Sequence, residues 1–123
     1  MPTQDQHLNK AQHNERFFAS FDIDITPYLD WVITGIFYAG LHYIRALAAK
    51  HRLTNISSYG EMDKLFSRLS VFRNNPSIYS DYRQLKDDSR AARYEMDRLS
   101  SRDVVELRDV EFNRIKSFVL SNL

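Results

Sequence analysis

The clearest pattern of apolar and polar positions lies between Thr26 and Leu53, where apolar residues recur with the period of an α-helix. Two different faces result when this stretch is placed on a helix at about 100° per residue. One face is apolar and carries Leu29, Ile33, Ile36, Gly40, Ile44 and Leu47. The other is mixed and carries Trp31, Tyr38, His42, Arg45 and Ala49, with Thr34 and Gly35 beside them. We expect the apolar face to belong to the core, so the mixed face becomes the first candidate for function.

The ends of this central helix are also marked in the sequence. Thr26 is a good N-cap, and Pro27 suits the first helical position. Asp30 lies near the positive end of the helix dipole, and a run of basic residues lies near the negative end. We therefore predict a helix from Pro27 to about Arg52, followed by a turn-rich connection over residues 53–60.

Helical periodicity predicts the elements on either side as well. The expected helices run from about Gln6 to Ser20, from Glu61 to Phe72, from Ile78 to about Leu99, and from a start signal at Ser100–Asp103 to about Ser121. Ser77 is expected to cap the helix that begins at Ile78, and residues 86–90 could divide that helix in two. Residues 21–25 alternate apolar and acidic side chains, which favours an extended linker whose apolar side chains lie on the core. The chain is thus predicted to be an all-α bundle of four or five helices.

The last two predicted helices carry clear apolar stripes. These are Ile78, Leu85, Ala92, Met96 and Leu99 in the first helix, and Val104, Leu107, Val110, Ile115, Phe118 and Val119 in the second. Opposite the first of these stripes lie Arg90, Arg93, Tyr94 and Asp97. This second stripe repeats the basic and aromatic character of the mixed face on the central helix. We expect the mixed face to meet the Arg93–Tyr94 segment.

Composition fits a soluble globular protein of this class. The 123 residues predict one domain over residues 1–123 with a loose tail at residues 1–5, and the contents of 43% hydrophobic and 27% charged residues are ordinary. The N-terminus has no apolar signal-peptide core, and His42 and Arg45 make the central helix a poor membrane span, so we expect a cytoplasmic protein without a membrane partner. The net charge is only +1, but 12 of the 17 basic residues are arginines, the better side chains for bidentate phosphate contacts.

Several kinds of site lack their motifs in this sequence. Without cysteine there can be no thiolate nucleophile, and no glycine-rich phosphate loop, H-E-x-x-H or G-x-S-x-G motif is present. Asp22 and Asp24 lack a third carboxylate nearby, and His7 and His13 lack the spacing of a helical zinc pair and are expected on the solvated surface. The sequence therefore predicts no cofactor and no metal site.

The remaining chemistry belongs to tyrosine, histidine and arginine. Tyr38, His42 and Arg45 are neighbours on one helix face because they are spaced i, i+4 and i+7. Histidine can exchange protons near neutral pH and arginine can hold a phosphate, which together suffice for metal-free cleavage of RNA at its 2′-hydroxyl. The alternative is a buried polar network, in which His42 and Arg45 hydrogen-bond Asp87, Asp88 or Asp97 and hold two helices together.

At these residues the chain resembles the HEPN superfamily of small all-α domains. The resemblance is carried by a W…FY..LH pattern (Trp31, Phe37-Tyr38 and Leu41-His42) and by an S-R-x-x-R-Y pattern at residues 89–94, and it spans roughly residues 28–120. It implies a four- or five-helix bundle, often a homodimer, often linked to RNA. Many HEPN proteins are metal-independent ribonucleases, including toxins and antiviral effectors, with Arg and His separated by four to six residues.

The resemblance leaves two hypotheses for function. In the first, the protein is a ribonuclease or RNA-binding protein of toxin or defence type. Arg45 grips phosphate and His51, five residues further on, or His42 moves protons, while Trp31, Tyr38, Arg90, Arg93 and Tyr94 bind or form a polar network. Ala46 stands where the family commonly has a polar residue. In the second hypothesis, the protein is a non-catalytic module for dimerisation or protein binding, with a partner such as a nucleotidyltransferase or an antitoxin.

Overall fold

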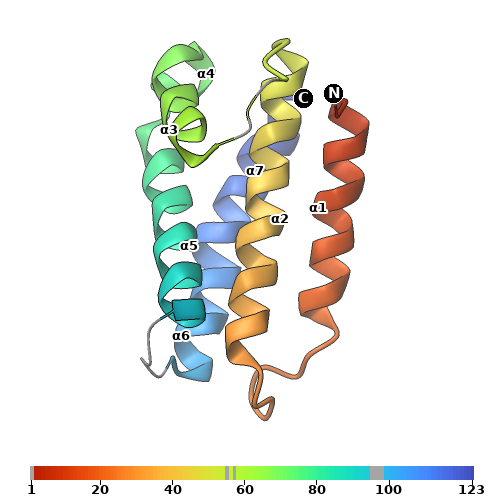
Figure 1. Cartoon of the computed structure of the whole chain (residues 1–123), viewed down its shortest axis with the longest axis vertical. Coiled ribbons are helices and arrows are strands. Elements are labelled where there is room, and N and C mark those ends of the chain that lie inside the picture. Colours follow the sequence, from red (N-terminus) through yellow and green to blue (C-terminus); the bar gives the residue numbers. More distant parts are fainter. Residues whose placement is uncertain (1, 55, 57, 95–98) are drawn as a thin grey trace.

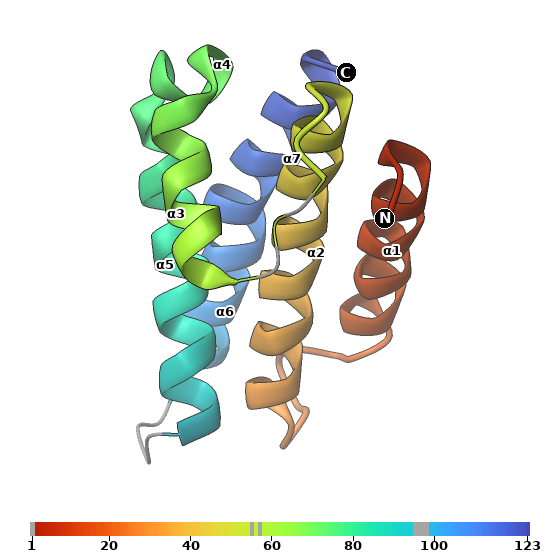
Figure 2. The same ribbon diagram turned by 45° about the horizontal axis from the view of Figure 1, so that its top comes forward.

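The computed structural model describes residues 2–54, 56, 58–94 and 99–123, and it confirms the all-α bundle within these ranges, where no β-strand occurs (Figure 1). The elements are α1 (Gln4–Ala19), α2 (Leu29–Lys50), α3 (Tyr59–Arg68), α4 (Ser70–Arg73), α5 (Pro76–Tyr94), α6 (Ser101–Glu106), the π-helix η1 (Leu107–Phe112) and α7 (Asn113–Ser121). The last three follow one another without a break and form one long helix. Together with α1, α2 and α5, this helix makes the body of the bundle, and α3 and α4 pack at one side (Figures 1 and 2).

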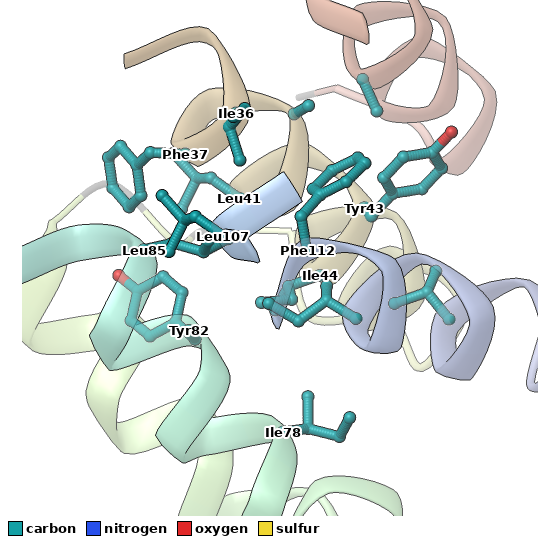
Figure 3. Close-up of a cluster of buried hydrophobic side chains, with 14 of the residues drawn as sticks. Ile36, Phe37, Leu41, Tyr43, Ile44, Ile78, Tyr82, Leu85, Leu107 and Phe112 are labelled. Carbon is teal, nitrogen blue, oxygen red and sulfur yellow. The ribbon is translucent and has the colours of Figure 1, made fainter. Parts of the chain in front are cut away.

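Helix α2 is the centre of the bundle, because its neighbours cover it on most of its circumference. The predicted apolar face is buried except for the half-buried Leu29. Val32, Phe37, Leu41 and Tyr43 are buried as well, and Figure 3 shows several of these side chains packed against α5 and the last helix. A helix that is apolar nearly all round is typical of a central position. By length and composition α2 could also cross a membrane, but 78% of its most apolar stretch is buried inside the bundle.

Part of the mixed face of α2 is covered by α1 and is not exposed to solvent. Thr34 and Gly35 are both buried. A Cβ atom placed on Gly35 would lie 3.0 Å from Cδ2 of Phe17 and 3.3 Å from Cβ of Phe18. Glycine therefore lets α1 approach α2 closely at this point.

Two predicted helix starts are wrong by a few residues. Helix α2 begins at Leu29, because the Thr26 hydroxyl accepts the backbone N–H of Tyr28 in a local turn and caps no helix. Helix α1 begins at Gln4, because Thr3 and Gln6 form a capping box. Only Pro2 and Thr3 precede α1 in the described structure, so the predicted tail is shorter than expected.

The segment from Glu61 to Phe72, predicted as one helix, is two. Leu69 adopts an extended backbone conformation that ends α3 and begins α4, and Phe72 is buried in the short second helix. Helix α5 then begins at Pro76, so Ser77 lies inside the helix and does not cap it. It runs unbroken through residues 86–90 and to Tyr94, while the predicted Met96 and Asp97 positions lie outside the described residues.

The last helix begins as predicted, with Ser100 as N-cap and Asp103 completing a capping box. It then continues as the π-helical turn η1, which the α-helical period assumed for the sequence does not predict. Val110, predicted in the core, is 37% exposed, whereas Phe112 is buried. Leu107 and Phe112 are five residues apart, and the i→i+5 turn of a π-helix brings such residues onto one face. The α-helical period assumed for the prediction selects Val110 instead.

The connection between α1 and α2 is a series of turns with a mixed orientation of its apolar side chains. Ile23 is buried and Phe21 is half-buried, as the linker hypothesis requires. Ile25 is 79% exposed, so the prediction that it lies on the core is wrong. The hydroxyl of Ser101 donates to the carbonyl oxygen of Ile23 at 2.9 Å and joins this connection to the start of α6.

Candidate functional site

Three basic and two aromatic side chains line a pocket of about 270 Å³ between α3 and α5, which we name the basic–aromatic pocket. Its lining residues are Tyr59, Lys86, Arg90, Arg93 and Tyr94. Helix α5 places its four members on neighbouring parts of its surface, because Lys86, Arg90 and Arg93 follow the i, i+4, i+7 pattern and Tyr94 follows Arg90 by four residues. Tyr59 comes from the first turn of α3, which Ser58 caps by accepting the N–H of Glu61 at 3.1 Å.

Cations and rings in this pocket lie against one another. Lys86 Nζ is 5.1 Å from the centroid of the Tyr59 ring, and Arg93 Cζ is 5.4 Å from that of Tyr94. Both distances are within the range of cation–π attraction. Tyr94 is nevertheless 76% exposed, and Arg90 points to solvent as well. Bases and phosphates can therefore reach this surface from outside.

Helix α2 contributes Tyr38 to the floor of the same region. Arg93 Nη1 donates to the Tyr38 hydroxyl at 3.3 Å, and Arg93 Nε donates to the Ser89 carbonyl oxygen at 3.3 Å. This contact confirms that the mixed face of α2 meets the Arg93–Tyr94 segment. Burial, followed by the nearby Tyr38 hydroxyl, raises the pKa of Tyr59, so the Tyr59 hydroxyl is neutral at pH 7.

Trp31 lies on the same face of α2 as Tyr38, seven residues or two turns earlier. It is 55% exposed, although it belongs to the most apolar helix of the chain. Four of the five residues predicted for binding, namely Tyr38, Arg90, Arg93 and Tyr94, are thus brought together, and Trp31 lies on the adjoining surface.

The sequence interpretation missed Lys86 and Tyr59. Lys86, Arg90 and Arg93 follow the i, i+4, i+7 pattern, which could have identified the lysine. Tyr59 reaches the pocket only through the connection between α2 and α3, and no periodic pattern links it to α5. Its place depends on tertiary structure alone.

A second polar group of the mixed face, His42, contacts His7 of α1. Their Nδ1 atoms are 3.1 Å apart, so one ring donates its proton to the other, and the ring centroids are 5.3 Å apart. His7 is only 7% exposed, and the prediction that it is solvated is wrong. His13 is exposed as predicted. We name His7 and His42 the histidine pair.

The surroundings keep both rings of the histidine pair neutral. Burial, followed by the charges of His7, Arg45 and Lys10, lowers the pKa of His42 to about 4. Burial and the Arg45 charge also lower the pKa of His7. A group with so low a pKa is unprotonated at pH 7 and cannot act as a general acid there.

The predicted catalytic residues Arg45 and His51 lie apart in the described structure, with no contact between their side chains. Arg45 is half-buried beside the histidine pair, and its Nε atom is buried without a hydrogen-bond partner. His51 is exposed at the C-terminal end of α2. Cleavage by Arg45, His51 and His42 stays a prediction.

The polar network predicted around aspartates takes a different form. Asp87 is exposed and Asp88 accepts from Gln84 at 2.9 Å, so neither bonds His42 or Arg45, and Asp97 lies outside the described residues. The buried carboxylate is Asp81, which accepts two bonds from Arg114 of α7 at 2.9 and 2.6 Å. Helices α2 and α5 are instead linked by Tyr38 and Arg93.

The basic–aromatic pocket is suited to binding a planar, negatively charged group. Guanidinium and ammonium groups attract phosphate, and exposed tyrosine rings offer faces for stacking. Lys86 Nζ lies 4.0 Å from the carboxylate of Asp63, which also accepts a hydrogen bond from the Tyr79 hydroxyl. Comparisons of the chain with protein-family models, with curated proteins and with solved structures find no match.

Proposed function

We propose that this chain is a HEPN-like helical protein that binds single-stranded RNA at the basic–aromatic pocket. The observation that carries the proposal is the lining of that pocket by three cations and two tyrosines, with no carboxylate among the lining residues that the structure describes. The two segments on which the resemblance to HEPN domains rests, around Tyr38 and over residues 89–94, also lie against each other there. The all-α bundle is the fold that the resemblance implies.

Single-stranded RNA fits this pocket better than a duplex does. Unpaired bases expose their faces, and stacking on an aromatic side chain stabilises each one by about 1–3 kcal/mol. Tyr94 and Trp31 are exposed for such stacking, and Arg90 can reach a backbone phosphate. Duplex bases are already stacked and would leave these rings unused.

Binding is favoured over cleavage for two reasons. Arg45 and His51 do not meet in the described structure, and the neutral His42 is a weak base with no proton to give at pH 7. We therefore expect the purified protein to leave generic RNA intact in EDTA. RNA cleavage that disappears in both Arg45→Ala and His51→Ala would overturn this expectation and establish the nuclease hypothesis.

Fluorescence anisotropy with a labelled uridine 12-mer tests the binding site. We expect Arg90→Ala and Tyr94→Ala each to weaken binding by about fivefold or more, through a lost phosphate contact and a lost stacking partner. Arg83→Ala is the matched control, because Arg83 is an exposed arginine on the same helix that does not line the pocket. Equal losses for Arg83→Ala and Arg90→Ala, or no binding by the wild type, would contradict the proposal.

Homodimerisation and a protein partner such as a nucleotidyltransferase or an antitoxin stay predictions. Four large apolar side chains are exposed near one end of the bundle, namely Phe17, Ile25, Tyr28 and Trp31. Apolar surface of this kind often marks protein interfaces. Sedimentation velocity over a range of protein concentrations would show whether the chain associates with itself.

A further inference from the structure

The histidine pair lies in a region of unbalanced positive charge. Lys10 and Arg45 both act on His42 electrostatically, and no carboxylate is among the charges that act on either ring. Neither Lys10 nor Arg45 forms an ion pair with a carboxylate in the described part of the chain. The buried Nε of Arg45 also lacks a hydrogen-bond partner. Two cations and two imidazoles therefore lie in one region, where neither cation is paired with a carboxylate of the described residues.

This region adjoins the basic–aromatic pocket along α2. His42 follows Tyr38 by four residues, which is about 6 Å along the helix axis on the same face. Tyr38 in turn accepts the hydrogen bond from Arg93 of the pocket. Helix α1, which carries His7 and Lys10, runs beside α2 in both views (Figures 1 and 2). The contacts of Tyr38 with Arg93 and of His42 with His7 thus place the pocket and the histidine pair about one helical turn apart on α2.

We infer that Lys10, His7, His42 and Arg45 form a second subsite, which takes a backbone phosphate of the RNA strand whose neighbouring nucleotide occupies the basic–aromatic pocket. The inference rests on the proposed RNA binding for the identity of the ligand, but the anion subsite stands on its own contacts. Lys10 is exposed and His42 and Arg45 are half-buried, so the phosphate approaches from the solvent side.

Proton uptake follows from this arrangement. Burial and the neighbouring His7 contribute most to lowering the pKa of His42 to about 4, and the charges of Arg45 and Lys10 lower it further. A phosphate beside the pair offsets the charges of these two cations. The pKa of His42 therefore rises in the complex, and because linkage is reciprocal, RNA binds more tightly as the pH falls. Each unit by which that pKa rises gives about a tenfold gain in affinity once the pH is below the pKa values of both states. The charged groups that act on the pair are Lys10 of α1 and Arg45 of α2.

Proton NMR of the histidine rings tests this subsite directly. The protein is titrated between pH 3.5 and 8 alone, with a uridine 8-mer, and with inorganic pyrophosphate. We expect the titration midpoint of His42 to rise by at least about one unit with the 8-mer. The exposed His13 of the same protein is the internal control and should not move.

The RNA-binding affinities of variants provide a second test of this subsite. Lys10→Gln, an exposed change that should not disturb folding, is expected to weaken RNA binding severalfold at every pH. His42→Gln is expected to abolish the gain in affinity at low pH, whereas His13→Gln should retain it. Because the gain develops only as the pH approaches the pKa of about 4, a wild-type affinity that is the same at about pH 4 and about pH 7.5 would overturn the inference.

The outcomes separate this inference from the proposed function. If the 8-mer shifts the ring signals of Tyr59 and Tyr94 but leaves His42 unchanged, RNA binding stands and the second subsite is wrong. If the 8-mer shifts none of these signals but pyrophosphate shifts His42, the anion subsite stands and RNA binding is wrong. If neither probe shifts His42, the subsite is overturned.

Discussion

Single residues in this protein show how strongly burial changes ordinary side chains. His7 and His42 are part of the interface between α1 and α2, and they lie there as neutral rings with an Nδ1–Nδ1 hydrogen bond. The buried Asp81 carboxylate accepts two hydrogen bonds from Arg114, which joins α5 to α7. Neither partner could be chosen from the sequence, since 35 and 33 positions separate the members of these pairs.

The lowered pKa values make stability depend on pH. In the unfolded chain His42 binds a proton below its ordinary pKa of 6.5, whereas in the folded state it does so only near 4. The unfolded state thus holds more protons between these values, and the protein loses stability as the pH falls from 6.5 towards 4. We expect the loss attributable to His42 to be about 2 kcal/mol, after allowing for water that reaches the half-buried ring. Urea denaturation of wild type and His42→Gln at pH 7.5 and 4.5 measures it, and equal pH dependence of the two would contradict it.

The Asp81–Arg114 pair should contribute more than its partly exposed position suggests. Arg114→Ala removes the partner of the Asp81 carboxylate, which is only 3% exposed in the folded protein, so we expect a clear fall in melting temperature. Arg108→Ala is the control, because Arg108 pairs with the adjacent, exposed Asp109 at 2.7 Å and such pairs stabilise by less than about 1 kcal/mol. Similar melting temperatures for both variants would show that the buried carboxylate needs no partner.

At the scale of helices, sequence patterns located the elements well and their irregularities poorly. The apolar stripes of α2 and α5 were predictable because burial on one face leaves a periodic trace in the sequence. The break at Leu69 and the π-turn η1 were not predictable in this way. Both depend on how the side chains pack after the helices meet, and a regular period cannot represent either.

Close helix approach at Gly40 gives a test at this scale. A Cβ atom there would lie 2.7 Å from Cδ1 of the buried Leu85 in α5, so Gly40→Ala forces α2 and α5 apart or displaces that leucine. Such overpacking costs about 1–3 kcal/mol and outweighs the gain of about 1 kcal/mol in helix propensity. We expect a net loss of about 1 kcal/mol in the free energy of unfolding.

Gly60→Ala is the matched control for that measurement. The nearest side-chain atom to a Cβ on Gly60 is Ser58 Oγ at 3.9 Å, which is an ordinary contact. We expect this variant to be neutral or more stable by up to about 1 kcal/mol. Chemical denaturation of both variants checks the pair, and a Gly40→Ala protein as stable as Gly60→Ala would contradict the close approach.

For the whole molecule, the sequence predicted the all-α fold class and the contact between the mixed face of α2 and the Arg93–Tyr94 segment of α5. It predicted only part of the basic–aromatic pocket and of the histidine pair. Tyr38, Arg90, Arg93 and Tyr94 were identified because they repeat at helical spacing on α2 and α5. Tyr59 and His7 were missed, because each comes from another element and only the assembled bundle brings it to its partners. A site built between helices leaves a trace in the sequence only for those members that share a helix.

The assembled charge distribution predicts how RNA binding responds to salt. The protein carries a net charge of only +1, so attraction at long range is weak and binding must depend on the local cations. With three cations in the pocket, affinity for a uridine 12-mer should fall about tenfold between roughly 50 and 200 mM salt. Anisotropy at a series of salt concentrations measures the slope, and affinity independent of salt would contradict phosphate contacts.

The π-turn η1 also determines where the last helix can tolerate the deletion of one residue. A π-turn contains one residue more than the α-helical turn it replaces, while the helix on either side keeps its orientation. Deleting the exposed Val110 would leave Leu107 and Phe112 separated by four positions, as a regular α-helix requires. We expect this deletion to preserve the fold by circular dichroism, whereas deleting Arg83 from the regular α5 would rotate all later side chains by about 100° and unfold the protein. The last helix is thus a segment in which a one-residue deletion is expected to preserve the helical bundle.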